Sequence, residues 1–192
     1  MKKHLLFTVA VLTQVAAFAV EPTARFDFKV LATSKTSTME KEMNEAAQAG
    51  YVFQGVMGGE TAFGGKEVLV IMGRSSTPGG QKSYRLLAAN KTSTLEKEMQ
   101  LAAETGFEYK GQTIFESAFG GREVSVIMER DKTAGAKNGP SYRLLATSKT
   151  STMEKELAEA GSAGYAVIGM TVSKTAFGGN EVVCILKRDA SE

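Results

Sequence analysis

A stretch of 47 residues occurs three times in this chain of 192 residues, and that repetition limits what the chain can fold into. The copies span residues 28–74, 84–130 and 142–188 without internal gaps, and the first and third are identical at 27 of the 47 positions. Linkers of 9 and 11 residues, both containing Gly and Pro, join the copies. A fixed period of this length is typical of an array of one small structural unit. We therefore expect a single fold that is repeated three times.

Each copy has the pattern of one helix among three strands. In the third copy, a short β-rich run precedes a stretch with apolar residues at helical spacing, namely Met153, Leu157 and Ala160. Gly164 then stands where a left-handed helix cap is expected. Two further β-rich runs flank the segment Ala-Phe-Gly-Gly at 176–179, and a glycine pair between strands is typical of a hairpin turn.

These patterns predict an α+β fold made of three tandem β-α-β-β units. Each unit should be a three-stranded, mainly antiparallel sheet with one helix on one face. We place the three repeats at residues 26–74, 82–130 and 140–189.

The last predicted strand of each copy is apolar on both faces. In the first copy, Val68, Val70 and Met72 form the face that we expect the helix to cover. The opposite face carries an isoleucine in each copy, and we assign a leucine of each first strand to it as well: Ile71, Ile127, Ile185, Leu31, Leu87 and Leu145. A sheet face that is open to water is normally polar. We therefore predict that this second face is buried between repeats or between chains.

The motif Lys-Thr-Ser-Thr-Met/Leu-Glu-Lys-Glu begins each predicted helix. Its serine and the glutamate three residues later have the spacing of a capping box, in which each side chain accepts a hydrogen bond from a free backbone N–H group. The predicted pairs are Ser37 with Glu40, Ser93 with Glu96 and Ser151 with Glu154. The alternative is a binding site for an anion or a partner, because helix N-termini attract negative charge. Its residues would be Lys35, Thr36, Lys91, Thr92, Lys149 and Thr150.

Two further residue types are candidates for function. The aromatic side chains beside the hairpin glycines, Phe63, Phe119 and Phe177, would be binding residues if exposed, although packing over their own helices is the alternative. Cys184 alternates with Val182 and Leu186 along the last strand, which predicts a buried and inert thiol rather than a nucleophile.

Residues 1–19 have the pattern of a secretory signal peptide. Lys2 and Lys3 precede an apolar run, and Ala17-Phe18-Ala19 has the form of a cleavage site. The run is shorter than the ~20 apolar residues that a spanning helix needs. We therefore expect a periplasmic or secreted protein that is cleaved near Ala19 and has no membrane span in its mature form.

The mature chain has few chemical groups suited to catalysis. Its single histidine, His4, leaves with the signal peptide, and one cysteine cannot form an internal disulfide, so histidine triads and His-rich zinc sites are excluded. The plausible acids, Glu40, Glu42 and Glu67, form no recognisable pair. We predict no catalytic residues, no metal, no cofactor and no enzymatic activity. Removal of the signal leaves 21 basic and 21 acidic side chains, and this balance argues against nucleic-acid binding.

The repeat resembles the small bacterial module called domain of unknown function 4177. The likeness rests on the first strand, on the helix that ends in glycine and an aromatic residue, and on the last strand that closes in arginine. In the third copy these are Tyr142 to Leu145, Glu156-Leu157, Gly164-Tyr165 and Val182 to Arg188. Tyr51, Phe107 and Tyr165 stand where that family usually has tryptophan. The resemblance implies a fold and no activity, because the family has none assigned.

Taken together, these features predict an exported, non-enzymatic tandem-repeat protein that acts as an interaction or structural module of the bacterial envelope. Three near-identical units favour multivalent contact, so we expect a protein partner or self-association. The alternative is a small-molecule or anion-binding protein that uses the helix N-termini and the Ala-Phe-Gly-Gly hairpins.

Overall fold

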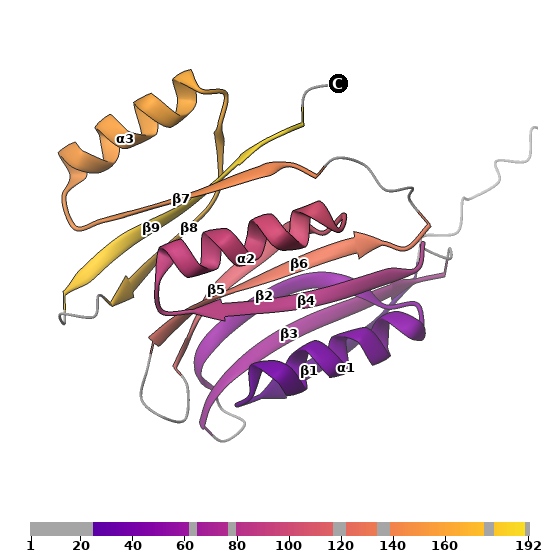
Figure 1. Cartoon of the computed structure of the whole chain (residues 1–192). Coiled ribbons are helices and arrows are strands. Elements are labelled where there is room, and N and C mark those ends of the chain that lie inside the picture. Colours follow the sequence, from indigo (N-terminus) through magenta and orange to yellow (C-terminus); the bar gives the residue numbers. More distant parts are fainter. Residues whose placement is uncertain are drawn as a thin grey trace, which may run out of the picture.

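Each repeat folds into a three-stranded antiparallel sheet with one helix, which confirms the predicted fold class (Figure 1). The computed structural model describes residues 25–61, 65–76, 80–116, 122–133, 139–174 and 179–190. The first repeat contains β1 (Phe26–Thr33), α1 (Thr36–Gln48), β2 (Val52–Thr61) and β3 (Gly65–Ser75). The second contains β4 (Lys82–Ala89), α2 (Thr92–Glu104), β5 (Glu108–Glu116) and β6 (Arg122–Asp131). The third contains β7 (Ser141–Thr147), α3 (Thr150–Ser162), β8 (Ala166–Lys174) and β9 (Asn180–Arg188).

The last strand of each repeat lies at the centre of its sheet. The strand orders are β1-β3-β2, β4-β6-β5 and β7-β9-β8, and all neighbours are antiparallel. The first strand of each repeat is therefore an edge strand. Its outward backbone groups need partners from outside the sheet, since unpaired edges promote association.

The helices begin two residues earlier than the capping-box prediction requires. Lys35, Lys91 and Lys149 are the N-cap residues, and none of them makes a side-chain cap hydrogen bond. The first helical hydrogen bond of α1 already runs from Met39 N to the Lys35 carbonyl, at 3.1 Å. Ser37 is thus the second helical residue and not the cap, as are its counterparts Ser93 and Ser151. The capping-box prediction is wrong, and the glutamate of the motif has another role that is described below.

The helix ends agree with the prediction. Gly50, Gly106 and Gly164 have φ values of +85°, +83° and +83°, a conformation that other residues rarely adopt. After α1, Gly50 N donates to the Ala47 carbonyl and Tyr51 N donates to the Ala46 carbonyl, which is the hydrogen-bond pattern of a Schellman motif.

The final arginine of each repeat closes the same helix end. Arg74 Nη1 donates to the Ala49 carbonyl at 3.1 Å, and its guanidinium lies 4.7 Å from the centre of the Tyr51 ring. Arg130 and Arg188 do the same with the helix ends and aromatic rings of their own repeats. The glycine–aromatic pair and the terminal arginine therefore have a structural role in each repeat.

The register of the first strands corrects one part of the predicted sheet faces. Leu31 lies opposite Val70, and directly opposed residues of an antiparallel pair point to the same face, so Leu31 is on the helix-covered face. Leu87 opposite Val126 and Leu145 opposite Cys184 are placed likewise. The assignment of these three leucines to the second face is wrong, because each pairs with a residue of the helix-covered face. The side chains that share the second face with the isoleucines are Val30, Leu86 and Leu144.

The repeats share their hydrophobic cores. One core joins Met39, Met43 and Val70 of the first repeat to Leu86 and Ile127 of the second. The next joins the α2 core of the second repeat to the corresponding residues of the third, including Leu144 and Ile185. The second faces of the second and third repeats thus cover the helices of the repeats before them, and the three helices lie in successive tiers with strands between them (Figure 1). Ile127 and Ile185 are buried, as predicted, whereas Ile71 is exposed.

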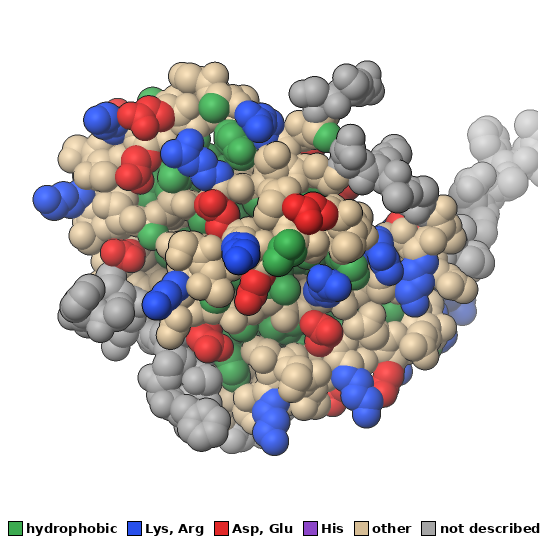
Figure 2. Space-filling model, in the orientation of Figure 1, with side chains coloured by type: hydrophobic (Ala, Val, Ile, Leu, Met, Phe, Trp, Pro, Cys, Tyr) green, Lys and Arg blue, Asp and Glu red, His purple; other side chains and the backbone are tan. Residues whose placement is uncertain are grey.

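The surface carries both signs of charge. In the view of Figure 2, Lys and Arg side chains alternate with Asp and Glu side chains. None of the helices in the described part of the chain is long and apolar enough to cross a membrane.

The shared core predicts unequal effects for one substitution at equivalent positions. We expect Ile127→Ala to lower the free energy of unfolding by about 2–5 kcal/mol, because it leaves a cavity between two repeats. Ile71→Ala removes the same atoms from an open face and should cost less than about 1 kcal/mol. Urea unfolding of both variants measures the difference, and equal losses would show that the repeats are independent.

Candidate functional site

The polar centre of each repeat interface is a pair of helix side chains bound to the edge strand of the next repeat. Glu40 Oε2 accepts a hydrogen bond from Leu86 N at 2.9 Å. Asn44, one turn further along α1, accepts from Tyr84 N at 3.0 Å and donates to the Tyr84 carbonyl at 2.9 Å. These side chains lie on one face of the helix because they are four residues apart. They give the outward groups of β4 the partners that an edge strand lacks.

The second interface repeats this arrangement. Glu96 Oε2 accepts from Leu144 N at 2.7 Å, and Gln100 Oε1 accepts from Tyr142 N at 3.1 Å. The glutamate of the repeated motif therefore joins one repeat to the next. The third repeat keeps this glutamate as Glu154 but has Ala158 where the others have an amide.

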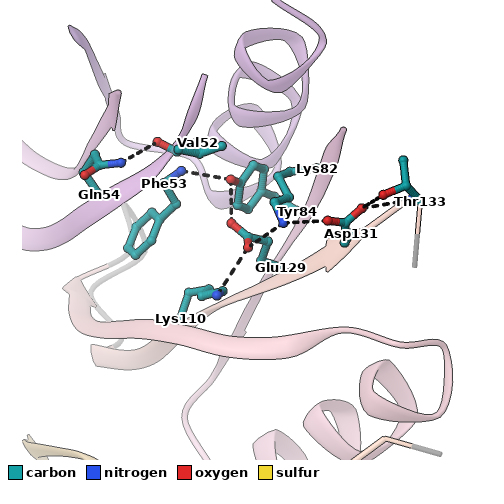
Figure 3. Close-up of polar contacts among 9 residues, drawn as sticks. All are labelled: Val52, Phe53, Gln54, Lys82, Tyr84, Lys110, Glu129, Asp131 and Thr133. Atoms are coloured by element: carbon teal, nitrogen blue, oxygen red, sulfur yellow. Dashed lines mark hydrogen bonds and ion pairs between the residues drawn. The ribbon is translucent and has the colours of Figure 1, made fainter. Parts of the chain in front are cut away.

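A tyrosine of the edge strand reaches back to the preceding repeat. Tyr84 Oη accepts a hydrogen bond from Phe53 N at 2.9 Å and donates to Glu129 Oε2 at 2.7 Å (Figure 3). The Phe53 N–H lies where β2 shifts register against β3, between Phe53 and Gly55. Tyr142 Oη accepts from Tyr109 N at 2.8 Å, beside the corresponding shift in β5. Each interface thus uses a tyrosine hydroxyl to satisfy an irregular point in the neighbouring sheet.

Charged side chains surround the Tyr84 hydroxyl in the first interface. Glu129 lies 3.3 Å from Lys110 and 3.8 Å from Lys82, and Lys82 lies 2.9 Å from Asp131 (Figure 3). Two hydrogen bonds from Thr133, together with Lys82, hold the pKa of Asp131 well below its usual range. The bond to Asp131 raises the pKa of Lys82 even though partial burial opposes this. The charges neutralise one another, and their arrangement positions Tyr84 within the interface.

Burial sets the protonation of the two interface tyrosines. Removal from water raises the pKa of Tyr84 well above its ordinary range, and raises that of Tyr142 to about 12, although a backbone N–H donor partly opposes the rise. Both hydroxyls are therefore protonated at neutral pH. They act as neutral hydrogen-bonding groups.

The second face of the first repeat is exposed, whereas the equivalent faces of the second and third repeats are buried in the inner interfaces. Phe28 and Val30 are each 57% exposed, whereas the corresponding Tyr84 and Leu86 are 2% and 8% exposed. We call this surface the head face, and define it by Phe26, Phe28, Val30, Met57 and Ile71, all of which are exposed. Within the described residues, no helix covers this face, and α1 packs only on the opposite face of its edge strand β1.

The helix-covered side of the third repeat corresponds to the other half of each inner interface, and it is exposed as well. Val167, Met170 and Val172 of β8 are exposed, on the sheet face that carries α3. Their counterparts in the inner interfaces, Phe53, Val56 and Gly58, or Tyr109, Gln112 and Ile114, are half-buried. We call this surface the tail face, and define it by these three residues with Glu154 and Ala158 of α3. Glu154 and Ala158 are exposed as well.

The candidate residues at the helix starts are not gathered into one site by any contact. Lys35, Lys91 and Lys149 are exposed at their helix caps, and Thr36, Thr92 and Thr150 follow them. None of these six side chains makes a hydrogen bond or an ion pair within the residues that the structure describes, so their proposed role stays a prediction. Phe63, Phe119 and Phe177 lie outside those residues.

Cys184 is buried, as predicted, and its burial raises the pKa of the thiol. Among the described residues, no group of three or more Asp, Glu, His or Cys side chains is arranged to hold a metal ion.

The residues that sequence reasoning missed are Asn44 and Gln100. A signal for them existed, since an amide occupies this helical position in two repeats and alanine occupies it in the third. The difference separates α1 and α2, which bind the edge strand of the next repeat, from α3, which binds no such strand within the described residues.

No family model matches this chain, and no curated protein or solved structure matches it either. The resemblance to domain of unknown function 4177 therefore stays a prediction.

The inter-repeat glutamates predict a clear contrast between repeats. Glu96→Ala should lower the free energy of unfolding by about 1.5–3 kcal/mol, because Leu144 N loses a charged acceptor in a half-buried site. Glu154→Ala removes the same group from an exposed position and should change stability by less than about 0.5 kcal/mol in the monomer. Thermal and urea unfolding measure both.

Ser93→Ala serves as the control for helix capping. We expect it to change stability by less than about 0.5 kcal/mol, because Ser93 is inside the first turn and makes no cap hydrogen bond. A loss for Ser93→Ala larger than that for Glu96→Ala would contradict the assigned roles.

The buried tyrosine predicts a loss of stability in alkali. Because the folded chain raises the pKa of Tyr142 from 10.0 to about 12, its contribution to stability is complete below pH 10 and is lost as the pH rises to about 12. Tyr142→Phe removes this titration and also leaves Tyr109 N without its acceptor. The stability gap between the original chain and Tyr142→Phe should therefore narrow above pH 10. Urea unfolding between pH 8 and pH 11.5 checks this, and a gap that stays constant would contradict it.

Proposed function

We propose that this protein is an exported, non-enzymatic module of the bacterial envelope whose head and tail faces bind protein. One observation carries the proposal. Of the nine large apolar side chains that are exposed in the described part of the chain, eight belong to these two faces, and the ninth is Leu101 on α2.

The physical cost of such faces supports a binding role. Burial of one large aliphatic or aromatic side chain contributes roughly 1.5–3 kcal/mol, so several together can support a stable contact. Repeat proteins that remain alone in solution normally close their arrays with terminal repeats that have a polar outer face. In this chain, exposed valine and methionine lie on both the head face and the tail face, and the head face carries exposed phenylalanine as well.

The N-terminal pattern supports the envelope as the location. Residues 1–19 have the basic start, the apolar run and the Ala-x-Ala site of a secretory signal, and we propose cleavage after Ala19. The balanced and interspersed charges of the remaining chain favour contact with protein over contact with nucleic acid or anionic lipid.

A second candidate, anion binding at the helix N-termini, retains one observation in its favour. None of the three helices has an acidic residue in its first turn, and each has an exposed lysine at its cap. The positive end of each helix dipole is therefore not neutralised by its own side chains.

Affinity capture from the envelope fraction of the native cell tests the proposal. Four bait chains are used, each beginning at Val20. One is unchanged, one carries Val30→Lys on the head face, one carries Met170→Lys on the tail face, and one carries both substitutions. The control is Leu101→Lys, which adds the same charge at the one large apolar side chain that is exposed outside the two faces in the described part of the chain. We expect the unchanged bait and the control to retain bound protein, and the double variant to lose most of it.

Two results would contradict the proposal. One is a set of captured proteins that the double variant retains unchanged. The other is the absence of any captured protein, together with a rise in melting temperature on addition of phosphate that is lost when Lys35, Lys91 and Lys149 are replaced by alanine. The second result would favour the anion-binding candidate.

A further inference from the structure

We infer that the occupant of each face is a second copy of this chain, so that the tail face of one molecule binds the head face of the next. This inference rests on the proposed function, since it names the partner of the same two faces. The two faces are the two halves of one interface, and that interface already occurs twice within each molecule.

The edge strand of the head face has the backbone groups that the tail face can bind. Val30 corresponds to Leu86 and Leu144, whose N–H groups donate to Glu40 and Glu96 of the preceding helix. The third helix retains the glutamate as Glu154, although this side chain is exposed and accepts no strand N–H within the described residues. In an assembly that copies the inner interfaces, Glu154 accepts a hydrogen bond from Val30 N of the next molecule.

Gly55, which lies beside the head face, gives independent support for this inference when it is compared with its counterparts Gly111 and Gly169. Gly111 faces the preceding repeat so closely that a Cβ atom there would lie 3.1 Å from the Phe53 ring and 3.3 Å from Val56. Gly169 in the third repeat would meet Tyr109 and Gln112 in the same way. Gly55 is the corresponding residue of the first repeat, and a Cβ atom there would have no neighbour within 4 Å.

The space above Gly55 matches what the tail face offers. Val167 corresponds to Phe53 and Tyr109, and Met170 corresponds to Val56 and Gln112. Their side chains are exposed and project from the sheet face that, in the inner interfaces, packs on this glycine. The first repeat therefore keeps a glycine at the position where the two inner interfaces pack closely on one, although no neighbour packs on it within its own molecule.

The contact between molecules has fewer hydrogen bonds than the inner interfaces. Ala158 replaces the amide that would bind the backbone of Phe28, and Phe28 lacks the hydroxyl that would accept from Val167 N. Association is therefore weaker than the contact between covalently linked repeats, and it depends on concentration. Because the two faces differ, the contact is heterologous, and it produces open chains or closed rings rather than a twofold dimer.

Sedimentation velocity of the purified mature chain over a range of concentrations tests this inference. Gly55→Leu is expected to block the head face, because a Cβ atom at this position has no neighbour within 4 Å in its own molecule and the φ of Gly55 lies outside the left-handed region. Met170→Lys blocks the tail face at an exposed side chain. We expect the unchanged chain to form oligomers and each variant alone to be monomeric. An equimolar mixture should form dimers and nothing larger, since it contains one free head face and one free tail face.

Two further variants make the test specific. Leu101→Lys should associate like the unchanged chain. Ala158→Asn restores the amide opposite the Phe28 backbone and should tighten association about tenfold, since two hydrogen bonds are added. Melting temperatures show whether each variant is folded. If Gly55→Leu or Met170→Lys does not fold, Val30→Lys replaces the former on the head face and Val172→Lys replaces the latter on the tail face.

The inference is overturned if the unchanged chain stays monomeric at every concentration, or if one blocked variant alone still associates. If the purified chain is monomeric and yet captures a different protein through the same faces, the inference fails while the proposed function stands. If neither self-association nor capture depends on the two faces, the inference and the proposed function both fail.

Discussion

The structure depends on how the outward backbone groups of each first strand find hydrogen-bond partners. A carboxylate and an amide on the helix of one repeat bind the edge strand of the next, at Leu86 and Tyr84 in the first interface. A helix side chain can bind the backbone of the edge strand only if that strand lies against the helix. The apolar residues of the strand and the helix then pack into one core. The polar contact and the hydrophobic contact therefore specify the same arrangement, which is how a unique packing of similar repeats is selected.

This arrangement also explains how a unit of 47 residues is stable. A domain of this size buries too little apolar surface to offset its loss of conformational entropy. Here the outer side of α1 is covered by β4, and the outer side of α2 by β7. Each repeat completes the core of the one before it, so stability belongs to the array more than to its members.

Local patterns predicted local structure well. The helices, the strands and the left-handed glycines at residues 50, 106 and 164 follow from spacing and residue type, because they depend on neighbours in the chain. The face on which Leu31 lies was not predictable, since it depends on the pairing register with β3, and a shift by one residue exchanges the two faces. Of the candidate site residues, Lys35 and its counterparts were located correctly at the helix starts, but the contact residues Asn44 and Gln100 were not identified. Their partners are 40 and 42 residues away in the sequence, in another repeat.

The division of contacts between repeats has a consequence for the order in which the chain folds. Closure of each helix end needs an arginine only 25 residues further on, so it is complete as soon as a repeat has emerged. The outer side of the helix must wait for a strand that is made later, as α1 waits for β4. A chain that is made from its N-terminus therefore completes each core with a delay of one repeat, because Ile127 of β6 belongs to the core around α1 as well as Leu86 of β4. Until then the apolar outer side of the helix is exposed. Within the described residues, no later strand covers the outer side of α3, where Glu154 and Ala158 are exposed, so this step remains unfinished there.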